Sequence, residues 1–249
     1  MDGCVEGAEM AGMFMFRMSL PCARRPVCGG GLRNEYSRLL RRFQHLRAGS
    51  RSGPLDQFGL WQRWPGVIQA ELGSGRHVIE EGLSGRTTVR DDPVEGEHKN
   101  RRCYLKPCLQ SHTPVDLLII MLGTNDLKRR YNQPAPEVAI GIGCLFLDTR
   151  ELGTGPGGKM PGIMIVAPPP MHDDLKEWHQ SFDGAPARSR ELALAFEIIA
   201  DSLEVHFFDA ASVCTCDPVD GFHLSAEARA SLGAALAREI VGISWLDRS

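Results

Sequence analysis

Two residues near the carboxyl end of the chain have the types and the spacing that suit proton transfer. Asp220 and His223 lie three residues apart in the segment VDGFHLSAEA. On a turn, this spacing lets the carboxylate accept a hydrogen bond from one ring nitrogen, which leaves the other nitrogen free to act as a base. An aspartate and a histidine at this spacing also occur by chance, so the pair alone does not establish catalysis.

Two further residues could stabilise negative charge. Asn125 follows a continuous apolar run in DLLIIMLGTNDLK, and Gly85 follows another short run in VIEEGLSGRTT. An asparagine in a turn usually bonds its own backbone, and a glycine can simply serve a turn that needs positive φ. A side-chain amide and a glycine N–H are nevertheless the donors that an oxyanion hole requires.

Short apolar runs alternate with longer amphipathic ones from Ser52 onward, which predicts an α/β fold with a mostly parallel sheet. The predicted strands lie in HVIEEGL, VDLLIIML, GIMIVA and VHFFDA, and the predicted helices in GVIQAEL, ARSRELALAFEIIADSL and SAEARASLGAALAREIVGI. Ser225 is the expected N-cap of the last helix. In such sheets ligands bind beyond the carboxyl ends of the strands, so the loops carrying Gly85, Asn125, Pro168–Pro170 and His223 should share one edge.

Taken together, these segments resemble a known family. VIEEGLSGRTT, DLLIIMLGTNDLK and VDGFHLSAEA resemble the second, third and fifth conserved blocks of the SGNH (GDSL-type) hydrolases. RWPGVIQAELG, VAPPP and FFDAASV resemble the arylesterase and acyltransferase branch of that superfamily. The similarity extends over about residues 60 to 245, with the blocks in the family's order.

The resemblance implies a flavodoxin-like three-layer α/β/α fold and cleavage or transfer of small esters through an acyl-serine intermediate. It assigns the general base to His223, the orienting acid to Asp220, and two oxyanion donors to Asn125 and Gly85. A histidine base must be neutral to accept a proton, so we expect activity to rise with pH through the histidine range. No metal or organic cofactor is implied, and relatives in this branch form oligomers, so a homo-oligomer is also expected.

The family's first block, a Gly-Asp-Ser turn that supplies the nucleophile, is not found in the sequence. Ser37, in GGGLRNEYSRLL, is the only serine close to the expected place, and Ser19 lies further away. The sequence also shows no counterpart of the family's first strand, because RRPVCGGG contains too few consecutive apolar residues to form one. The alternative is therefore a catalytically inactive SGNH-like protein that binds an acyl or glycosyl ligand.

The sequence predicts two regions: an atypical basic extension over residues 1–55 and a hydrolase-like domain over residues 56–249. The segment from Arg17 to Arg63, both included, contains ten arginines and two acids, Glu35 and Asp56. A nucleic-acid-binding arm is disfavoured because few aromatic residues interleave with the arginines. Three interpretations stay open: a disordered extension, a partly helical one, or a segment whose reading frame has shifted.

Composition limits the remaining function classes. The net charge of −3 argues against a chain that binds nucleic acid as a whole, and no apolar run approaches the ~20 residues of a membrane helix. The apolar run near the amino end is split by Arg17 and follows acidic residues, unlike a signal peptide. The eight cysteines include no CxxC pair, so we expect no zinc and a reducing, cytoplasmic location.

Overall fold

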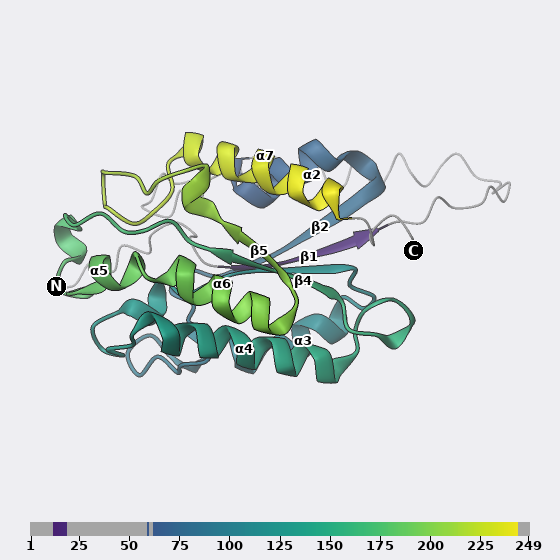
Figure 1. The fold of residues 1–249 in the computed structure, drawn as a ribbon, viewed down its shortest axis with the longest axis horizontal. Helices are drawn as coiled ribbons and strands as arrows, with labels where there is room; N and C mark the ends of the chain where they lie inside the picture. The colour runs from purple at the N-terminus through teal and green to yellow at the C-terminus, as the bar shows by residue number, and fades with distance from the viewer. Residues whose placement is uncertain (1–11, 19–58, 60–61, 244–249) are drawn as a thin grey trace, which may run out of the picture.

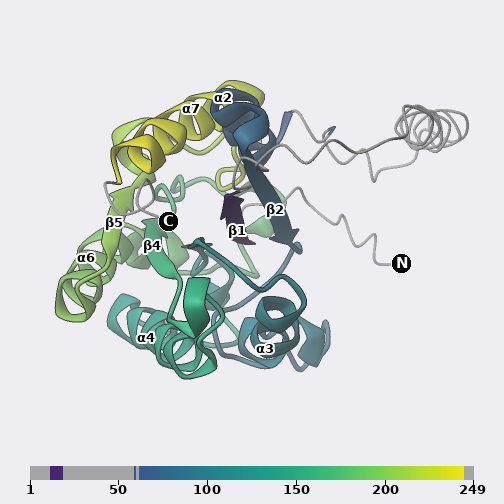
Figure 2. The same ribbon diagram turned by 90° about the vertical axis from the view of Figure 1, so that its right-hand side faces the viewer.

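A five-stranded sheet with helices on both faces forms the centre of the molecule (Figures 1 and 2). The computed structural model describes residues 12–18, 59 and 62–243. The strand order is β2-β1-β3-β4-β5. The strands are β1 (Gly12–Met18), β2 (Arg76–Gly82), β3 (Leu117–Met121), β4 (Gly162–Ala167) and β5 (His206–Asp209).

The helices form two outer layers. Figure 1 shows α2 (Trp64–Leu72) and α7 (Ala226–Gly242) over one face of the sheet. The other face carries α3 (Arg101–Ser111), α4 (Ala135–Leu152) and α6 (Leu192–Leu203). The predicted helix that ends in EIIADSL is in fact two helices, the short α5 (Ala185–Ser189) and α6. The expected three-layer α/β/α arrangement is confirmed.

The continuous apolar run of β3 is explained by burial on both faces of the strand. Leu117, Ile119 and Met121 belong to the core that includes side chains of α2 and α7. Leu118 and Ile120 belong to the core on the opposite face. Because neighbouring side chains of a strand point to opposite faces, a strand covered on both sides needs apolar residues at every position.

Four of the five strands run in one direction. β3, β4 and β5 pair in parallel, and β1 pairs antiparallel with both of its neighbours, β2 and β3. β2 therefore runs in the same direction as β3. The loops that follow β2, β3, β4 and β5 consequently leave the sheet at the same edge, as the sequence predicted.

The expectation that a first strand is missing is corrected only in part: β1 precedes β2 in the chain and joins the sheet, but it is antiparallel to both of its neighbours. Gly12–Met18 lies between β2 and β3, where Met15 pairs with both Ile79 and Leu118 and is fully buried. The apolar residues of GMFMFRM suit a position with neighbours on both sides. The sequence shows this apolar run, but Arg17 interrupts it and it lies far before the other predicted strands, so the run was not predicted as a strand.

The ends of the elements follow from local chemistry. The Ser225 side chain accepts a hydrogen bond from the N–H of Ala228 at 3.2 Å, which confirms the predicted N-cap of α7. Pro168–Pro170 directly follow β4, where proline N atoms cannot continue the ladder. Within residues 12–18 and 62–243, no helix is both long and apolar enough to cross a membrane.

The predicted regional boundary between residues 55 and 56 lies outside the described residues, so it stays a prediction. The same is true of the predicted helix in YSRLLRRFQHL. β1 does show that residues 12–18 pair with strands of the predicted hydrolase-like domain.

Candidate active site

Asp220 and His223 form the hydrogen bond that their spacing predicted. The Nδ1 atom of His223 lies 2.6 Å from Oδ2 of Asp220. The other carboxylate oxygen, Oδ1, accepts from the backbone N–H groups of Phe222 at 3.1 Å and His223 at 2.9 Å. Burial alone would raise the pKa of Asp220, but the hydrogen bonds from the ring and backbone of His223 lower it to about 2. An ionised carboxylate only accepts, so Nδ1 carries the proton and Nε2 is left as the basic nitrogen.

A tight turn holds this pair in place. The N–H of Gly221 donates to the carbonyl of Asp217 at 2.8 Å, and the N–H of Asp217 donates to the carbonyl of His223 at 2.6 Å. Gly221 has φ +88°, and a Cβ atom there would lie 2.7 Å from the carbonyl oxygen of Asp174. Glycine is therefore required both by the backbone conformation and by the close approach of the neighbouring loop.

Aromatic packing joins the loop after β5 to the loop after β4. The Phe222 ring lies 5.1 Å from Phe182 and 5.5 Å from Trp178, measured between centroids, and 4.0 Å from the ring of His223. Phe182 and Phe222 are buried. Phe222 precedes His223 in the chain, so the contacts of Trp178 and Phe182 with Phe222 restrict the position of His223. The role of Phe182 is therefore to pack beneath the histidine loop.

Asn125 stands directly beyond β3, at the start of a single 3₁₀ turn over Asn125–Leu127. Its carbonyl accepts from the N–H of Lys128 at 3.2 Å, whereas its side-chain amide makes no hydrogen bond to any described residue. Asn125 is only 7% exposed. A nearly buried amide without a partner in the described chain is available to a bound ligand.

The side chain of the neighbouring Asp126 connects the Asn125 turn to the loop after β2 through hydrogen bonds. Its carboxylate accepts from the N–H of Thr88 at 3.0 Å and from the Thr88 hydroxyl at 2.6 Å. Complete burial raises the pKa of Asp126 to about 6, against the opposing effect of the hydrogen bonds from Thr88. The segment GRTT that carries Gly85 is thereby held beside the turn that carries Asn125.

Gly85 has φ +77°, and a Cβ atom there would lie 2.7 Å from Oε2 of Glu95. Its backbone N–H donates to no described group. The carbonyl of the preceding Ser84 accepts from Nζ of Lys99 at 2.8 Å. Gly85 therefore presents a free N–H from a loop whose backbone is held by a buried lysine.

An ion-pair cluster that sequence reasoning missed lies between the two loops. Nζ of Lys128 lies 2.5 Å from Oε1 of Glu95 and 3.6 Å from Oδ2 of Asp92. Arg130 contacts Asp92 at 2.8 Å, and Lys99 lies 3.5 Å from Glu95. Because these partners come from two separate loops, no spacing in the sequence indicates them. The cluster connects the Gly85 loop to a lysine three residues after Asn125.

The predicted nucleophile cannot be placed, since Ser37 and the weaker candidate Ser19 both lie outside the described residues. The thiol nearest to the pair in sequence, Cys216, is not a substitute. Its Sγ lies 3.4 Å from the carbonyl of Phe222, and burial raises the pKa of this thiol to about 12. A thiol at that pKa supplies almost no thiolate at neutral pH.

β1 does not lead the chain toward His223. Gly12 pairs with Gly82 and Met121, at the carboxyl ends of β2 and β3, and Met18 pairs with Arg76, at the start of β2. Because β1 is antiparallel, it ends at the edge opposite the Asn125 and His223 loops. The turn with the nucleophile is expected directly after the family's first strand, and the end of β1 does not occupy that place.

The comparisons with known proteins agree with the resemblance read from the sequence. The native aryl esterase of M. smegmatis is 38% identical, with a TM-score of 0.72, over 76% of this chain and 88% of that chain. A carbohydrate acetylesterase from Sinorhizobium meliloti is 40% identical, with a TM-score of 0.73, over 77% of this chain and 90% of that chain. No curated protein matches the chain.

Residues 46–230 match the family described as "GDSL-like Lipase/Acylhydrolase family", and they include Gly85, Asn125, Asp220 and His223. This match covers more than half of the sequence. The chain therefore belongs to the GDSL-like lipase/acylhydrolase family.

Proposed function

We propose that the protein is a serine-type carboxylic ester hydrolase or acyltransferase that acts on small esters through an acyl-enzyme. The observation that carries this proposal is the His223–Asp220 hydrogen bond of 2.6 Å. It leaves Nε2 as the base, in a loop at the same sheet edge as Asn125. Family membership and the aryl esterase and carbohydrate acetylesterase neighbours support the same class of reaction.

In the first half of the proposed reaction, a serine Oγ attacks the ester carbonyl carbon while Nε2 of His223 takes the hydroxyl proton. The carbonyl electron pair moves onto oxygen, and the oxyanion accepts hydrogen bonds from the Asn125 amide and the Gly85 N–H. As the tetrahedral intermediate collapses, the bond to the leaving alcohol breaks and His223 returns its proton to that oxygen.

In the second half, water attacks the acyl-serine with His223 again as base, which releases the acid and restores the serine. An alcohol in place of water would accept the acyl group, so the same site would act as an acyltransferase. Asp220 keeps its negative charge throughout and stabilises the imidazolium formed in each half.

We propose Ser37 as the nucleophile, because it is the serine closest in sequence to the expected first block. The direction of β1 favours a second candidate function, in which this chain binds an ester or acyl ligand without cleaving it. In that case Asn125 and Gly85 would still receive the ligand oxygen, but no hydroxyl would reach the carbonyl carbon.

Hydrolysis of p-nitrophenyl acetate by the purified full-length chain separates these two candidates. We expect saturable turnover that is lost in His223→Ala and retained in His179→Ala, a change at an exposed histidine. Turnover equal to buffer from a folded protein would contradict the enzyme and favour the ligand-binding candidate. Activity that survives His223→Ala would contradict the assigned base.

We also propose a cytoplasmic location and self-association. The cysteines that the structure describes, Cys103, Cys108, Cys144, Cys214 and Cys216, are all free, which suits a reducing compartment. Fractionation of the producing cells and light scattering of the purified chain test these two points. A secreted protein with paired cysteines, or a strictly monomeric one, would contradict them.

A further inference from the structure

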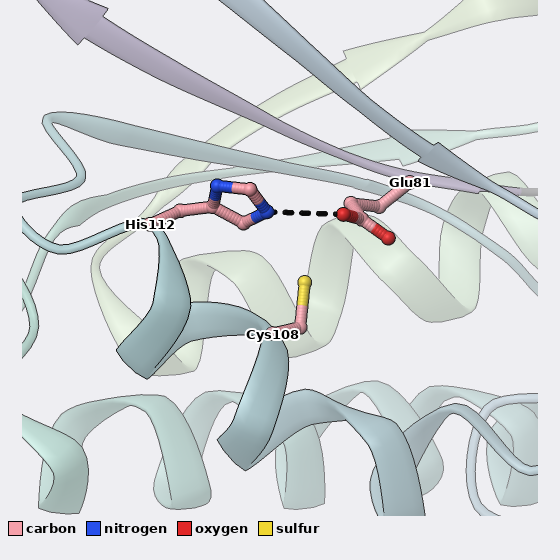
Figure 3. A group of neighbouring side chains, drawn as sticks. All are labelled: Glu81, Cys108 and His112. Carbon is pink, nitrogen blue, oxygen red and sulfur yellow. Dashed lines mark hydrogen bonds and ion pairs between the residues drawn. The ribbon is translucent and has the colours of Figure 1, made fainter.

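Three side chains with metal-binding atoms converge between β2 and α3. Glu81 is the next-to-last residue of β2, Cys108 lies on α3, and His112 caps the end of the same helix. Their ligand atoms all lie within 4.8 Å of one another. Figure 3 shows Cys108 and His112 rising from adjacent turns of α3 toward the carboxylate of Glu81. β2 and β5 are the two outermost strands of the sheet, so this cluster is separate from the Asp220–His223 pair.

The spacing of the three residues suits one ion. Cys108 and His112 are four residues apart on a helix, which places them on the same face. Nε2 of His112 lies 3.1 Å from Oε1 of Glu81. Zinc–ligand bonds of about 2.0–2.3 Å in a tetrahedron separate the ligand atoms by about 3.3–3.8 Å. The carboxylate and imidazole therefore need only a small outward movement to accept an ion between them.

The donor set selects a particular class of metal. A thiolate sulfur and an imidazole nitrogen favour zinc and related soft ions over magnesium or calcium, which prefer oxygen ligands. Cys108 is 1% exposed, whereas the side chains of His112 and Glu81 are 30% and 19% exposed. An ion could therefore enter from the side of His112 and reach a sulfur that is otherwise enclosed.

The groups around Cys108 affect whether its sulfur binds a metal ion as a thiol or as a thiolate. Burial, with a smaller contribution from Glu81, raises the pKa of the Cys108 thiol to about 12, so metal binding must displace its proton. Nη2 of Arg101 lies 3.8 Å from Sγ and can donate to the resulting thiolate. Arg86 and Arg101 donate to the main-chain carbonyl of Glu81 at 3.3 Å and 3.1 Å. The guanidinium groups of Arg86 and Arg101 would repel a divalent ion. The carboxylate of Glu81 and the thiolate of Cys108 together carry two negative charges, which offset the charge of the ion.

We propose that Glu81, Cys108 and His112 form a binding site for a zinc-class divalent ion, with water as the fourth ligand. This proposal departs from the expectation of no zinc, which considered only the spacing of cysteines and not a site shared with Glu81 and His112. The ion would join the end of β2 to α3, just before the loop that carries Gly85. This role is structural and does not depend on the proposed ester chemistry.

Cobalt and zinc titrations of the full-length chain test this site. Cobalt should add a thiolate-to-cobalt charge-transfer band at one ion per chain, because a thiolate ligand is required for that band. The band should be lost in Cys108→Ser and retained in Cys103→Ser, a change at an exposed cysteine of the same helix. Zinc affinity, measured by competition with a chromophoric chelator, should fall at least tenfold in Cys108→Ser.

His112→Gln serves as the second variant, because His112 lies at the half-exposed end of α3 and its replacement leaves the core intact. Zinc affinity should again fall at least tenfold in this variant. Equal affinity in the wild type and either variant, or a cobalt band that survives Cys108→Ser, would overturn the site. Circular dichroism of each variant confirms that a lost signal reflects lost ligands and not unfolding.

Discussion

Strand β1 and the four strands that run opposite to it contribute differently to the molecule. β3, β4 and β5 are parallel and deliver Asn125, Pro168–Pro170 and His223 to one edge. β1 also has a central position and a fully buried Met15, yet it runs in the opposite direction and ends at the other edge. Apolar residues are enough for a segment to form a buried central strand. A strand can bring a following side chain to the site only if it also runs in the correct direction.

The described residues supply four members of the candidate site, whereas the proposed nucleophile, Ser37, lies outside them. His223, Asp220, Asn125 and Gly85 all come from loops that follow strands of one direction. The nucleophile is expected after the first strand, where the direction is reversed.

Asp220→Asn should reduce kcat/KM for p-nitrophenyl acetate by about 10²–10⁴-fold, because the ring would lose the charge that fixes Nδ1 as the donor. Asp217→Asn is the matched control in the same turn, since its side chain accepts from the N–H of Val219 and does not contact the His223 ring. Activities that fall equally in both variants would show that the turn matters only for folding.

Asn125→Ala should reduce kcat by about 10²–10³-fold, the usual cost of one missing oxyanion donor. Asn132→Gly is the control in the same loop, because Asn132 has φ +47°, which glycine adopts without strain. Initial rates at saturating substrate give kcat directly. A loss confined to KM would mean that Asn125 stabilises the bound substrate and the transition state equally, which contradicts its role as an oxyanion donor.

Met15→Ala should lower the free energy of unfolding by about 2–5 kcal/mol, because it removes a fully buried side chain from the centre of the sheet. Urea denaturation measures the change, and Val94→Ala, at a residue that is 76% exposed, should alter stability by less than about 0.5 kcal/mol. If Met15→Ala changed the free energy of unfolding as little as the control does, Met15 would not be buried in the sheet. The position between β2 and β3 would then belong to another segment.

The Asp220–His223 hydrogen bond should also contribute to stability, by about 1–2 kcal/mol after allowance for partial exposure. The pKa of Asp220 is lowered from 3.8 to about 2 on folding, so this contribution is complete above about pH 4 and is lost as the pH falls toward 2. Urea denaturation of the wild type and Asp220→Asn between pH 5 and pH 2.5 should show a difference in the free energy of unfolding that shrinks as the pH falls below about 4. A difference that grows over this acidic range would contradict the assigned direction of the pKa shift.

The parts predicted from the sequence are those that local patterns determine. The four strands other than β1 follow from apolar runs, and the Asp220–His223 bond follows from a spacing of three residues. β1 was missed although its apolar run is visible, because Arg17 interrupts the run and it lies far before the other predicted strands. α3 was missed because Pro107 lies inside it and its apolar residues are few. The ion pairs of Lys128 with Glu95 and Asp92 join separate loops, so only the folded chain brings them together.

Covalent labelling with a phosphonate ester, followed by peptide mass spectrometry, tests whether His223 activates a serine nucleophile. We expect one serine, Ser37, to be labelled, and we expect His223→Ala to slow labelling at least a hundredfold while His179→Ala leaves the rate unchanged. A folded chain in which no serine is labelled, or in which His223→Ala does not slow labelling, would refute an acyl-serine mechanism that depends on His223.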